Sequence, residues 1–419
     1  MRFISFLFLA AAFVSCSSKP EWPRPGTWRA VIELQGQQLP FNLMVVPDSL
    51  NGVDAFIKNA GENLLLDEVS LNGDSIEMVV HIFDAKIQAK VNGDSMNGFF
   101  ILNYTAGYRL PFKAAYGQDF RFVKTDTSLV VPDFSGKYAV QFFNEKDTSR
   151  AIGIFSQQGN YAEGTFLTST GDYRFLEGNI IDDAMHLSTF DGNHLYLFKI
   201  KKINDSTLAG EHWLGKTRYR KWEGRKNPNA SLPDPESLTY LKKGFEKIEF
   251  SFPDVDARLP DGQGNKVSLT DDKFKNKVVI LQLFGTWCPN CMDETRFLAP
   301  WYKKNKNRGV EILGLAYERK SDFAYASERV KKMKSKLNVD YDFVIAGVND
   351  NAKALESLPM LDRFLGWPTT IFIGKDGKVK HIHTGFFGPG TGVYYEEQIQ
   401  RFNKIVQELL AENSALPSE

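Results

Sequence analysis

A continuous apolar run that leads directly into two closely spaced cysteines constrains this chain more than any other feature. Residues 277–285 read KVVILQLFG, and Cys288 and Cys291 follow within GTWCPNCMDE. An unbroken apolar run of this length predicts a strand that is buried on both faces of a sheet. We expect a helix to begin at the cysteines.

The residues around this motif predict an α/β domain over 248–419. After the cysteines, the expected elements are a buried strand at 309–317, a helix at 322–338, a hairpin at 369–385 that turns on Asp376-Gly377, and a closing helix with Ile399, Phe402, Val406 and Leu409 on one face. Strand, helix and strand followed by a hairpin and a helix indicate an α/β sandwich with a mixed sheet.

Residues 26–226 predict an antiparallel all-β region. Short alternating segments such as WRAVIEL and HLYLFKI are separated by turns such as LNGD, VNGD and FDGN. The region is also duplicated, with repeats at about 26–130 and 134–226: GTWRAVIEL at 26–34 parallels GKYAVQFF at 136–143, and EVSLNGDSIEMVV at 68–80 parallels EGNIIDDAMHLST at 177–189. A repeat of about 110 residues indicates two similar β units, or one larger sandwich or barrel.

The proline-rich segment 227–247 separates the two parts. Three prolines in its first half predict a linker, with a short helix at 236–244. A chain of 419 residues is in any case too long for one ordinary core, so two or three domains are expected.

The first sixteen residues, MRFISFLFLAAAFVSC, predict a targeting segment. Arg2 precedes an apolar run that is shorter than the roughly 20 residues needed to cross a bilayer, as in a secretory signal peptide. The end of this segment resembles the lipobox of bacterial lipoproteins, which implies diacylation of Cys16, a tether at 17–25, and a periplasmic or outer-membrane lipoprotein of the bacterial cell envelope. An ordinary signal peptide with an incidental cysteine is the alternative.

The charge balance argues against several classes of partner. Lys plus Arg and Asp plus Glu number 51 each, and no strongly basic stretch is present. We therefore expect no nucleic-acid partner. No other hydrophobic run is long enough to span a membrane.

The position of the cysteine pair predicts redox chemistry. A first sulfur at a helix N-terminus lies where unpaired N–H groups and the helix dipole favour negative charge, and Pro289 suits the first helical turn. These features lower the pKa of Cys288, so we expect Cys288 to attack a disulfide and Cys291, one turn later, to resolve the product.

Two alternatives compete with redox chemistry. Zinc requires about four ligands, and the chain offers no further cysteine pair, only His381 and His383, which we expect at the surface. A structural disulfide across two residues closes too short a loop to stabilise much. We therefore expect no metal and no cofactor.

Residues 248–412 resemble the thioredoxin superfamily, and within it the TlpA/ResA-like (AhpC/TSA-redoxin type) thiol-disulfide oxidoreductases. SFPDVDARLPDGQGNKVSLTD, KVVILQLFGTWCPNCMDE and GWPTTIFIGKDGKV occur in the family's order. The resemblance implies that Pro368 is the family's cis-proline, whose preceding residue Trp367 pairs its backbone with substrate. It also implies that Glu294 tunes the thiols or shuttles a proton, and that Trp287 shields the dithiol.

Three positions depart from the thioredoxin pattern. Gln282 replaces a buried aspartate that moves protons in cytoplasmic thioredoxins, which makes Glu294 or water the expected proton route. Trp367 is bulkier than the residue usual before the cis-proline, so it reshapes the groove. The long stretch between Cys288 and Pro368 matches a segment that TlpA-like proteins insert.

The resulting hypothesis is a membrane-anchored extracytoplasmic thiol-disulfide oxidoreductase that reduces protein disulfides and is recharged by a membrane electron donor. A thiol peroxidase of peroxiredoxin type is an alternative, because that class shares the fold, but the Pro-x-x-x-Thr framework before the reactive cysteine is absent. A binding protein with an accessory redox module is another, because the β region exceeds the redox domain in length.

Overall fold

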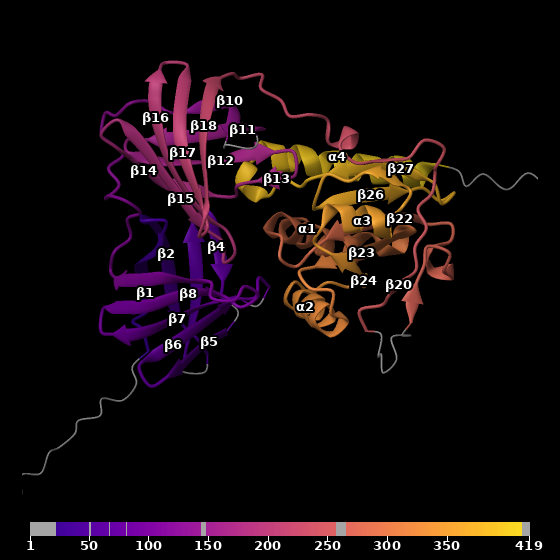
Figure 1. The fold of residues 1–419 in the computed structure, drawn as a ribbon, viewed down its shortest axis with the longest axis horizontal. Coiled ribbons are helices and arrows are strands. Elements are labelled where there is room, and N and C mark those ends of the chain that lie inside the picture. Colours follow the sequence, from indigo (N-terminus) through magenta and orange to yellow (C-terminus); the bar gives the residue numbers. More distant parts are fainter. Residues whose placement is uncertain are drawn as a thin grey trace, which may run out of the picture.

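The structure is a computed structural model that describes residues 22–49, 52–66, 68–80, 82–143, 148–256 and 265–412. The predicted signal peptide, its Cys16 and residues 17–21 of the tether lie outside the described residues. Figure 1 shows two parts side by side, an all-β region and an α/β domain.

The first half of the β region forms one nine-stranded antiparallel sheet in the order β4-β3-β2-β1-β9-β8-β7-β6-β5. Its strands are β1 (Gly26–Leu34), β2 (Gln37–Pro47), β3 (Val53–Asn59), β4 (Glu62–Leu65), β5 (Glu68–Asn72), β6 (Ser75–Val80), β7 (Ala85–Asn92), β8 (Ser95–Leu102) and β9 (Arg109–Tyr116). Buried and exposed residues alternate along most of them, as expected for a sheet with one face on a core.

The second half forms another nine-stranded antiparallel sheet in the order β11-β10-β18-β17-β16-β15-β14-β12-β13, and β11 also pairs with β12. Its strands are β10 (Gly136–Phe143), β11 (Thr148–Gln158), β12 (Tyr161–Thr168), β13 (Gly171–Asp172), β14 (Leu176–Ile181), β15 (Ala184–Phe190), β16 (Leu195–Asn204), β17 (Thr207–Leu214) and β18 (Arg218–Lys226). The β11–β12 pairing closes this sheet into a barrel.

The two halves share one strand order. In the first sheet β1 is followed across the sheet by β9, β8, β7, β6 and β5; in the second, β10 is followed by β18, β17, β16, β15 and β14. The repeated sequence segments fall on equivalent strands, β1 on β10 and β6 on β15. The duplication predicted from the sequence is therefore visible in the topology. Of the architectures left open by the sequence, the structure has two similar β units in succession, and the second is a barrel.

The α/β domain has a five-stranded mixed sheet in the order β24-β23-β22-β26-β27, with β22, β23 and β24 parallel. The strands are β22 (Val278–Phe284), β23 (Val310–Glu318), β24 (Asp342–Val348), β26 (Thr369–Ile373) and β27 (Val379–Thr384); the helices are α1 (Pro289–Asn305), α2 (Phe323–Lys336), α3 (Asn351–Ser357) and α4 (Val393–Ala411). Two short ladders pair β19 (Tyr240–Leu241) with β25 (Leu361–Arg363), and β20 (Phe252–Pro253) with β21 (Lys266–Val267). This is the thioredoxin-like arrangement that the resemblance implies.

Every residue of β22 is buried, because both faces of the sheet are covered. Val278, Ile280 and Phe284 pack in one core with α1, α2 and α4, whereas Val279 and Leu281 pack in a second core with α3. Gln282 is the one polar residue of the strand. It lies on the same face as Val278, Ile280 and Phe284 and so faces α1. The continuous apolar run in the sequence is thus explained by a strand with two buried faces.

One expectation for the connecting segment is wrong. Residues 236–244 do not form a helix: the chain makes a 3₁₀ turn at Pro235–Ser237 and then the short strand β19. The hydroxyl of buried Thr239 bonds that of Thr384 at 2.8 Å, and Glu236 bonds His381 at 3.1 Å. Pairing with the α/β domain supplies the backbone hydrogen bonds that a helix would otherwise provide.

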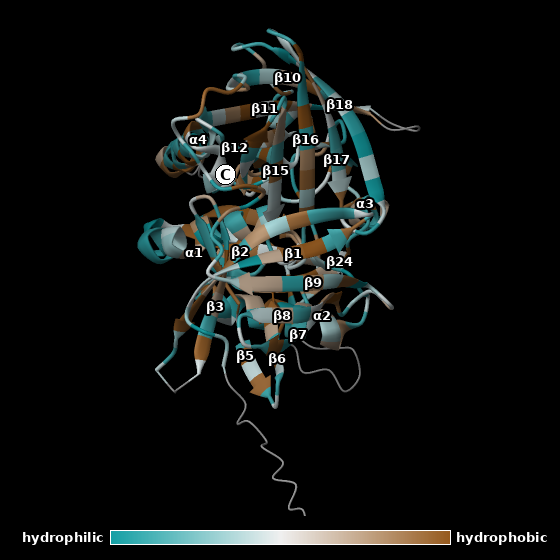
Figure 2. Ribbon diagram, turned by 90° about the vertical axis from the view of Figure 1, so that its left-hand side faces the viewer, coloured by the Kyte–Doolittle hydropathy of each residue, from teal (hydrophilic) through white to brown (hydrophobic). Residues whose placement is uncertain are grey.

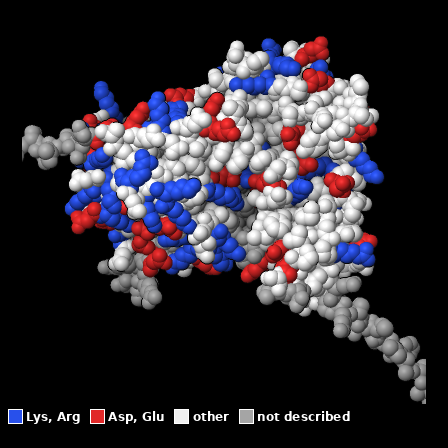
Figure 3. Space-filling model, turned by 180° about the vertical axis from the view of Figure 1, so that it is seen from behind, with Lys and Arg blue, Asp and Glu red and all other residues white. Residues whose placement is uncertain are grey.

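The surface carries no helix suited to membrane insertion: among the described residues, none is both long and apolar enough to cross a bilayer. Apolar and polar bands alternate along the strands of the β region (Figure 2). Charges of both signs are interspersed over the face shown in Figure 3, in keeping with the balanced composition.

Candidate active site

The two cysteines lie at the junction between β22 and α1. Cys288 is the N-cap of α1 and forms a disulfide with Cys291, and Pro289 occupies the first helical position. The backbone N–H of Cys291 donates to the Sγ of Cys288 at 3.2 Å. After reduction, this bond and the helix N-terminus would both favour the Cys288 thiolate, which is the nucleophilic form.

The turn before Cys288 is held by the end of β23. Thr286 donates its N–H and its hydroxyl to the two carboxylate oxygens of buried Glu318, at 2.8 and 2.9 Å. The indole N–H of Trp287 donates to the carbonyl of Tyr317 at 2.8 Å. A Cβ on Gly285 would lie 2.1 Å from the Nε1 of Trp287, so glycine is required for the indole to fold back here.

The residues implied by the family resemblance meet at this junction. The Trp367–Pro368 peptide bond is cis, as the resemblance implies. The Trp367 and Trp287 rings lie edge to face with centroids 5.5 Å apart, and Phe364 packs against Trp367 at 5.0 Å. The predicted residues Trp287 and Trp367, from two distant segments, thus form one aromatic cluster with Phe364 next to the active-site loop.

Glu294 is buried on the inner face of α1 and is bonded by neutral donors. Gln282 donates to it at 2.9 Å, and the hydroxyl of Thr370 also donates to it. Burial raises the pKa of Glu294 to about 7, although both hydrogen bonds act to lower it. Tyr341 fixes the amide of Gln282 by donating to its Oε1 at 3.0 Å.

Glu294 also borders a small cavity of about 20 Å³ together with His383 and Phe297. That volume is enough for a water molecule. Burial lowers the pKa of His383 to about 4, so its imidazole is neutral near pH 7. The surface position expected for His383 is met only in part: its side chain is half-buried and borders the cavity with Phe297, Phe372 and Phe402.

No group of three or more potential metal ligands occurs in the part of the chain that the structure describes. His381 and His383 lie on the same strand, but His381 bonds Glu236 at the domain surface while His383 points into the cavity next to Glu294. The pair does not converge on a common point with the cysteines.

The β region covers part of the surface around the dithiol. The turn between β12 and β13 lies against the start of α1: a Cβ on Gly171 would lie 1.5 Å from the side-chain nitrogen of Asn290. The same turn packs its backbone on Gly385, and Asp172 accepts a hydrogen bond from the N–H of Gly388 at 2.6 Å. Cys288 is 7% exposed, and Cys291 is fully buried.

A buried charge cluster joins the two parts of the molecule. Arg174, which follows β13, bonds Asp293 of α1 and Glu62 of β4, and its Nε lies 3.7 Å from Asp191. Burial, together with repulsion from Asp293, raises the pKa of Asp172 to about 6. One arginine therefore links both β sheets to the helix that carries the cysteines.

Several of these contact residues carried no signal in the sequence. Arg174, Asp293 and Asn193 each stand alone in ordinary segments, and Asn193 donates to the carbonyl of Trp287 at 3.1 Å from a loop of the β barrel. Only an interdomain contact makes them part of the site, and spacing along one chain does not reveal such contacts.

Comparison with known proteins places this site in a family. The Redoxin family model matches residues 247–398, which lie in the α/β domain and its linker. The thiol-disulfide oxidoreductase ResA of Bacillus thuringiensis subsp. konkukian is 31% identical over 134 residues, which cover 32% of this chain and 69% of that protein. The chain belongs to the ResA family of thiol-disulfide oxidoreductases.

Two further proteins are similar to parts of this chain. ResA of Bacillus subtilis is 29% identical to this oxidoreductase over 127 residues, covering 30% of the chain and 63% of that protein. A crystal structure of the thioredoxin domain of a thiol-disulfide oxidoreductase from Bacteroides vulgatus matches with 24% identity and a TM-score of 0.28, covering 39% of this chain and 99% of that domain.

Because Arg174 is the cation of this buried cluster, we predict that its removal causes a large, pH-dependent loss of folding stability. Arg174→Met in this oxidoreductase should lower the free energy of unfolding at pH 8 by about 3–5 kcal/mol, because it leaves buried carboxylates unpaired. The loss should shrink at pH 5, where Glu62 and Asp172, whose pKa values burial already raises, take up protons. Urea unfolding at both pH values measures this.

Arg225→Met is the matched control for that prediction. Arg225 is exposed on β18 and forms no ion pair with the described residues, so its replacement should change stability by less than about 0.5 kcal/mol. Equal losses for the two variants would contradict the role given to Arg174.

The raised pKa of Glu294 predicts a second pH effect. The folded protein retains a proton on Glu294 that the unfolded chain releases above pH 4.5, so this group makes stability fall as the pH rises from about 4.5 to about 7 and has no further effect above that. The loss of folding stability that Glu294 causes over this pH range is about 3 kcal/mol. Glu294→Gln should remove this part of the slope in urea unfolding at pH 5 and pH 8; parallel pH profiles for both proteins would count against it.

Proposed function

We propose that this oxidoreductase is a membrane-anchored, extracytoplasmic reductase of protein disulfides. The observation that carries the proposal is the geometry of Cys288, which caps α1 and accepts the N–H of Cys291 on its sulfur, and whose neighbour Trp287 packs on the Trp367 that precedes cis Pro368. This arrangement supplies a nucleophile, a resolving thiol and a wall for substrate.

The proposed reaction has two displacement steps. The Cys288 thiolate attacks one sulfur of a substrate disulfide, forming a mixed disulfide and releasing the other substrate sulfur as a thiolate that takes up a proton. Cys291 then loses its proton and attacks the Sγ of Cys288, which releases the second substrate thiol and forms the Cys288–Cys291 disulfide. Two electrons pass to the substrate, and a dithiol donor at the membrane must return them.

Other site residues have supporting roles in this proposal. Trp287, Trp367 and Pro368 position the substrate next to Cys288. Glu294 exchanges the proton of Cys291, because a carboxyl group with a pKa of about 7 can both give and accept a proton near neutral pH. The cavity shared with His383 has room for the water that would connect Glu294 to solvent.

The cellular position is inferred from the N-terminus and the family. We propose that residues 1–16 direct export, that Cys16 is diacylated in the bacterial cell envelope, and that 17–25 tether the folded protein to the membrane. Residues 26–226 then act as a recognition region, 227–247 as a packed connector, and 248–419 as the redox domain.

The order of attack makes a prediction for cysteine variants. Cys288→Ser should abolish reduction of insulin disulfides, because the attacking thiol is lost. Cys291→Ser should accumulate a mixed disulfide that non-reducing electrophoresis and mass spectrometry detect, because nothing resolves it. The reverse pattern would exchange the two roles, and turnover of hydrogen peroxide as fast as that of insulin would favour a thiol peroxidase instead.

The lipid anchor can be tested separately. In bacterial cells that express the full chain, Cys16→Ser should move the protein from the membrane fraction to the soluble fraction and remove the mass of the acyl groups, since no other anchor is proposed. Cys288→Ser should stay in the membrane fraction. A Cys16→Ser protein that remains membrane-bound would rule out this anchor.

A further inference from the structure

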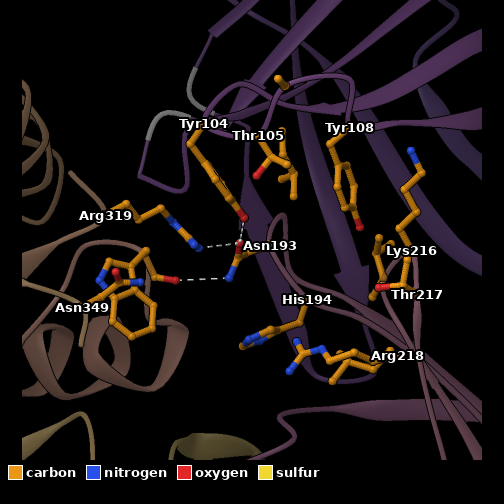
Figure 4. A pocket seen from close by; sticks show the side chains of 16 residues that line it. Tyr104, Thr105, Tyr108, Asn193, His194, Lys216, Thr217, Arg218, Arg319 and Asn349 are labelled. Atoms are coloured by element: carbon orange, nitrogen blue, oxygen red, sulfur yellow. Dashed lines mark hydrogen bonds between the residues drawn. The ribbon is translucent and has the colours of Figure 1, made fainter. Parts of the chain in front are cut away.

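A cavity of about 540 Å³ lies between the β region and the redox domain, beside the active-site loop (Figure 4). Its walls from the redox domain are Trp287, Arg319 and Asn349: Arg319 and Asn349 directly follow the parallel strands β23 and β24, and Trp287 lies three residues beyond the end of β22. Ligands of α/β proteins characteristically bind outside the carboxyl ends of such strands. The volume is in the usual range for binding sites.

The β region closes the cavity with three separate loops. Tyr104 and Tyr108 come from the connection between β8 and β9, His194 from that between β15 and β16, and Lys216 from the turn before β18, where Arg218 follows. Both β units and the redox domain therefore contribute. This cavity exists only in the assembled molecule.

The lining is positively charged and holds no described carboxylate. Lys216, Arg218 and Arg319 all border the cavity, and none of them forms an ion pair with any residue that the structure describes. Of the acids behind the lining, Asp191 is buried and bonds His194 at 3.1 Å, and buried Glu318 bonds Thr286 at 2.8 and 2.9 Å. Three unpaired cations around one concave surface favour an anionic ligand.

Aromatic contacts hold one of these cations in place. The guanidinium of Arg319 lies 3.7 Å from the centre of the Tyr104 ring and 5.5 Å from that of Trp287. Such stacking leaves the N–H donors at the edge of the guanidinium available to a planar carboxylate. Burial raises the pKa of Tyr108 to about 12, so its hydroxyl stays neutral and can also donate.

One residue connects the cavity to the dithiol. The amide of Asn193 donates to the carbonyl of Trp287 at 3.1 Å, and its oxygen accepts from the hydroxyl of Tyr104 at 3.1 Å and from Arg319 at 3.5 Å (Figure 4). Trp287 immediately precedes Cys288. Two hydrogen bonds, through Asn193, therefore connect Arg319 and any ligand that it holds to the backbone of the residue before the reactive cysteine.

The turn between β12 and β13 packs on Asn290, Gly366 and Gly385, so the protein itself fills the surface around these three residues. The cavity borders Trp287, the residue before Cys288, and is open to a ligand. A flexible chain segment fits such a recess better than the flat face of a folded protein.

We propose that this cavity binds a carboxylate-bearing peptide segment of the disulfide substrate, with Arg218, Lys216 and Arg319 as its cationic contacts. The identification of this ligand as part of the substrate rests on the proposed reductase function. It assigns to the β region a share in substrate selection: an acidic stretch next to the substrate cysteine would bind there while Cys288 attacks.

Binding and turnover test this separately. Three probes are titrated by calorimetry against the full-length protein: the cysteine-free peptide acetyl-Glu-Glu-Glu-amide, the same peptide with Gln in place of Glu, and free glutarate. The Glu peptide should bind about tenfold more tightly than its twin, the size of one hydrogen bond to a charged group. Arg218→Gln should remove this preference, Arg225→Gln on the same strand should retain it, and raising the salt from about 0.05 to about 0.5 M should weaken it.

The turnover arm uses two disulfide peptides that differ only in Glu or Gln beside the cysteine. The Glu peptide should show a kcat/KM about tenfold higher, lost in Arg218→Gln. Equal affinity for the Glu and Gln peptides, or glutarate binding as tightly as the Glu peptide, would overturn the inference even if both disulfides are reduced. Acidic-peptide binding that depends on Arg218, without reduction of either disulfide, would uphold the cavity and refute the reductase.

Discussion

The start of helix α1 at a cysteine is the constraint on which the rest of this structure depends. Strand β22 is buried on both faces and ends at Phe284, and the chain leaves the sheet at Gly285. The Cys288 sulfur then accepts the N–H of Cys291, so one contact both caps the helix and holds the thiol in the position where its charged form is stabilised. Folding and reactivity therefore share the same few atoms.

Gln282 is the one polar residue of β22, and it lies on the face of the strand that packs against α1. Gln282 is fully buried, and its amide satisfies Glu294, Thr295 and Tyr341 at once. A second carboxylate in this place would repel Glu294 and raise the cost of burial. An amide instead gives Glu294 a neutral donor at 2.9 Å.

The docking of the β region changes what the redox domain can meet. Arg174 brings carboxylates from both β sheets and from α1 to one buried point, an arrangement that is costly unless each charge has a partner. The β12–β13 turn lies against the start of α1, and loops of the β region border the cavity beside Trp287. The substrate site that we propose therefore includes surfaces that a lone thioredoxin-like domain would not have.

The sequence by itself determined the local part of this protein. Periodicity placed β22, β23, α2 and the β26–β27 hairpin, because burial on one or two faces leaves a regular mark on neighbouring residues. The duplication of the β region followed from repeated turns, and the motif around Cys288 led to Trp287, Glu294 and Pro368 through the family resemblance. The helix expected at 236–244 failed because pairing with the redox domain outweighed local propensity.

Only the tertiary structure decided how the two parts meet. Arg174, Asn193 and Arg218 lie far from the cysteines in sequence and follow no periodic pattern, so nothing local marks them. Their importance comes from distances across an interface, and an interface is a property of two folded surfaces rather than of any segment of chain. The sequence therefore specified a redox-active dithiol, while the assembled fold decided which residues of the β region surround the active-site loop.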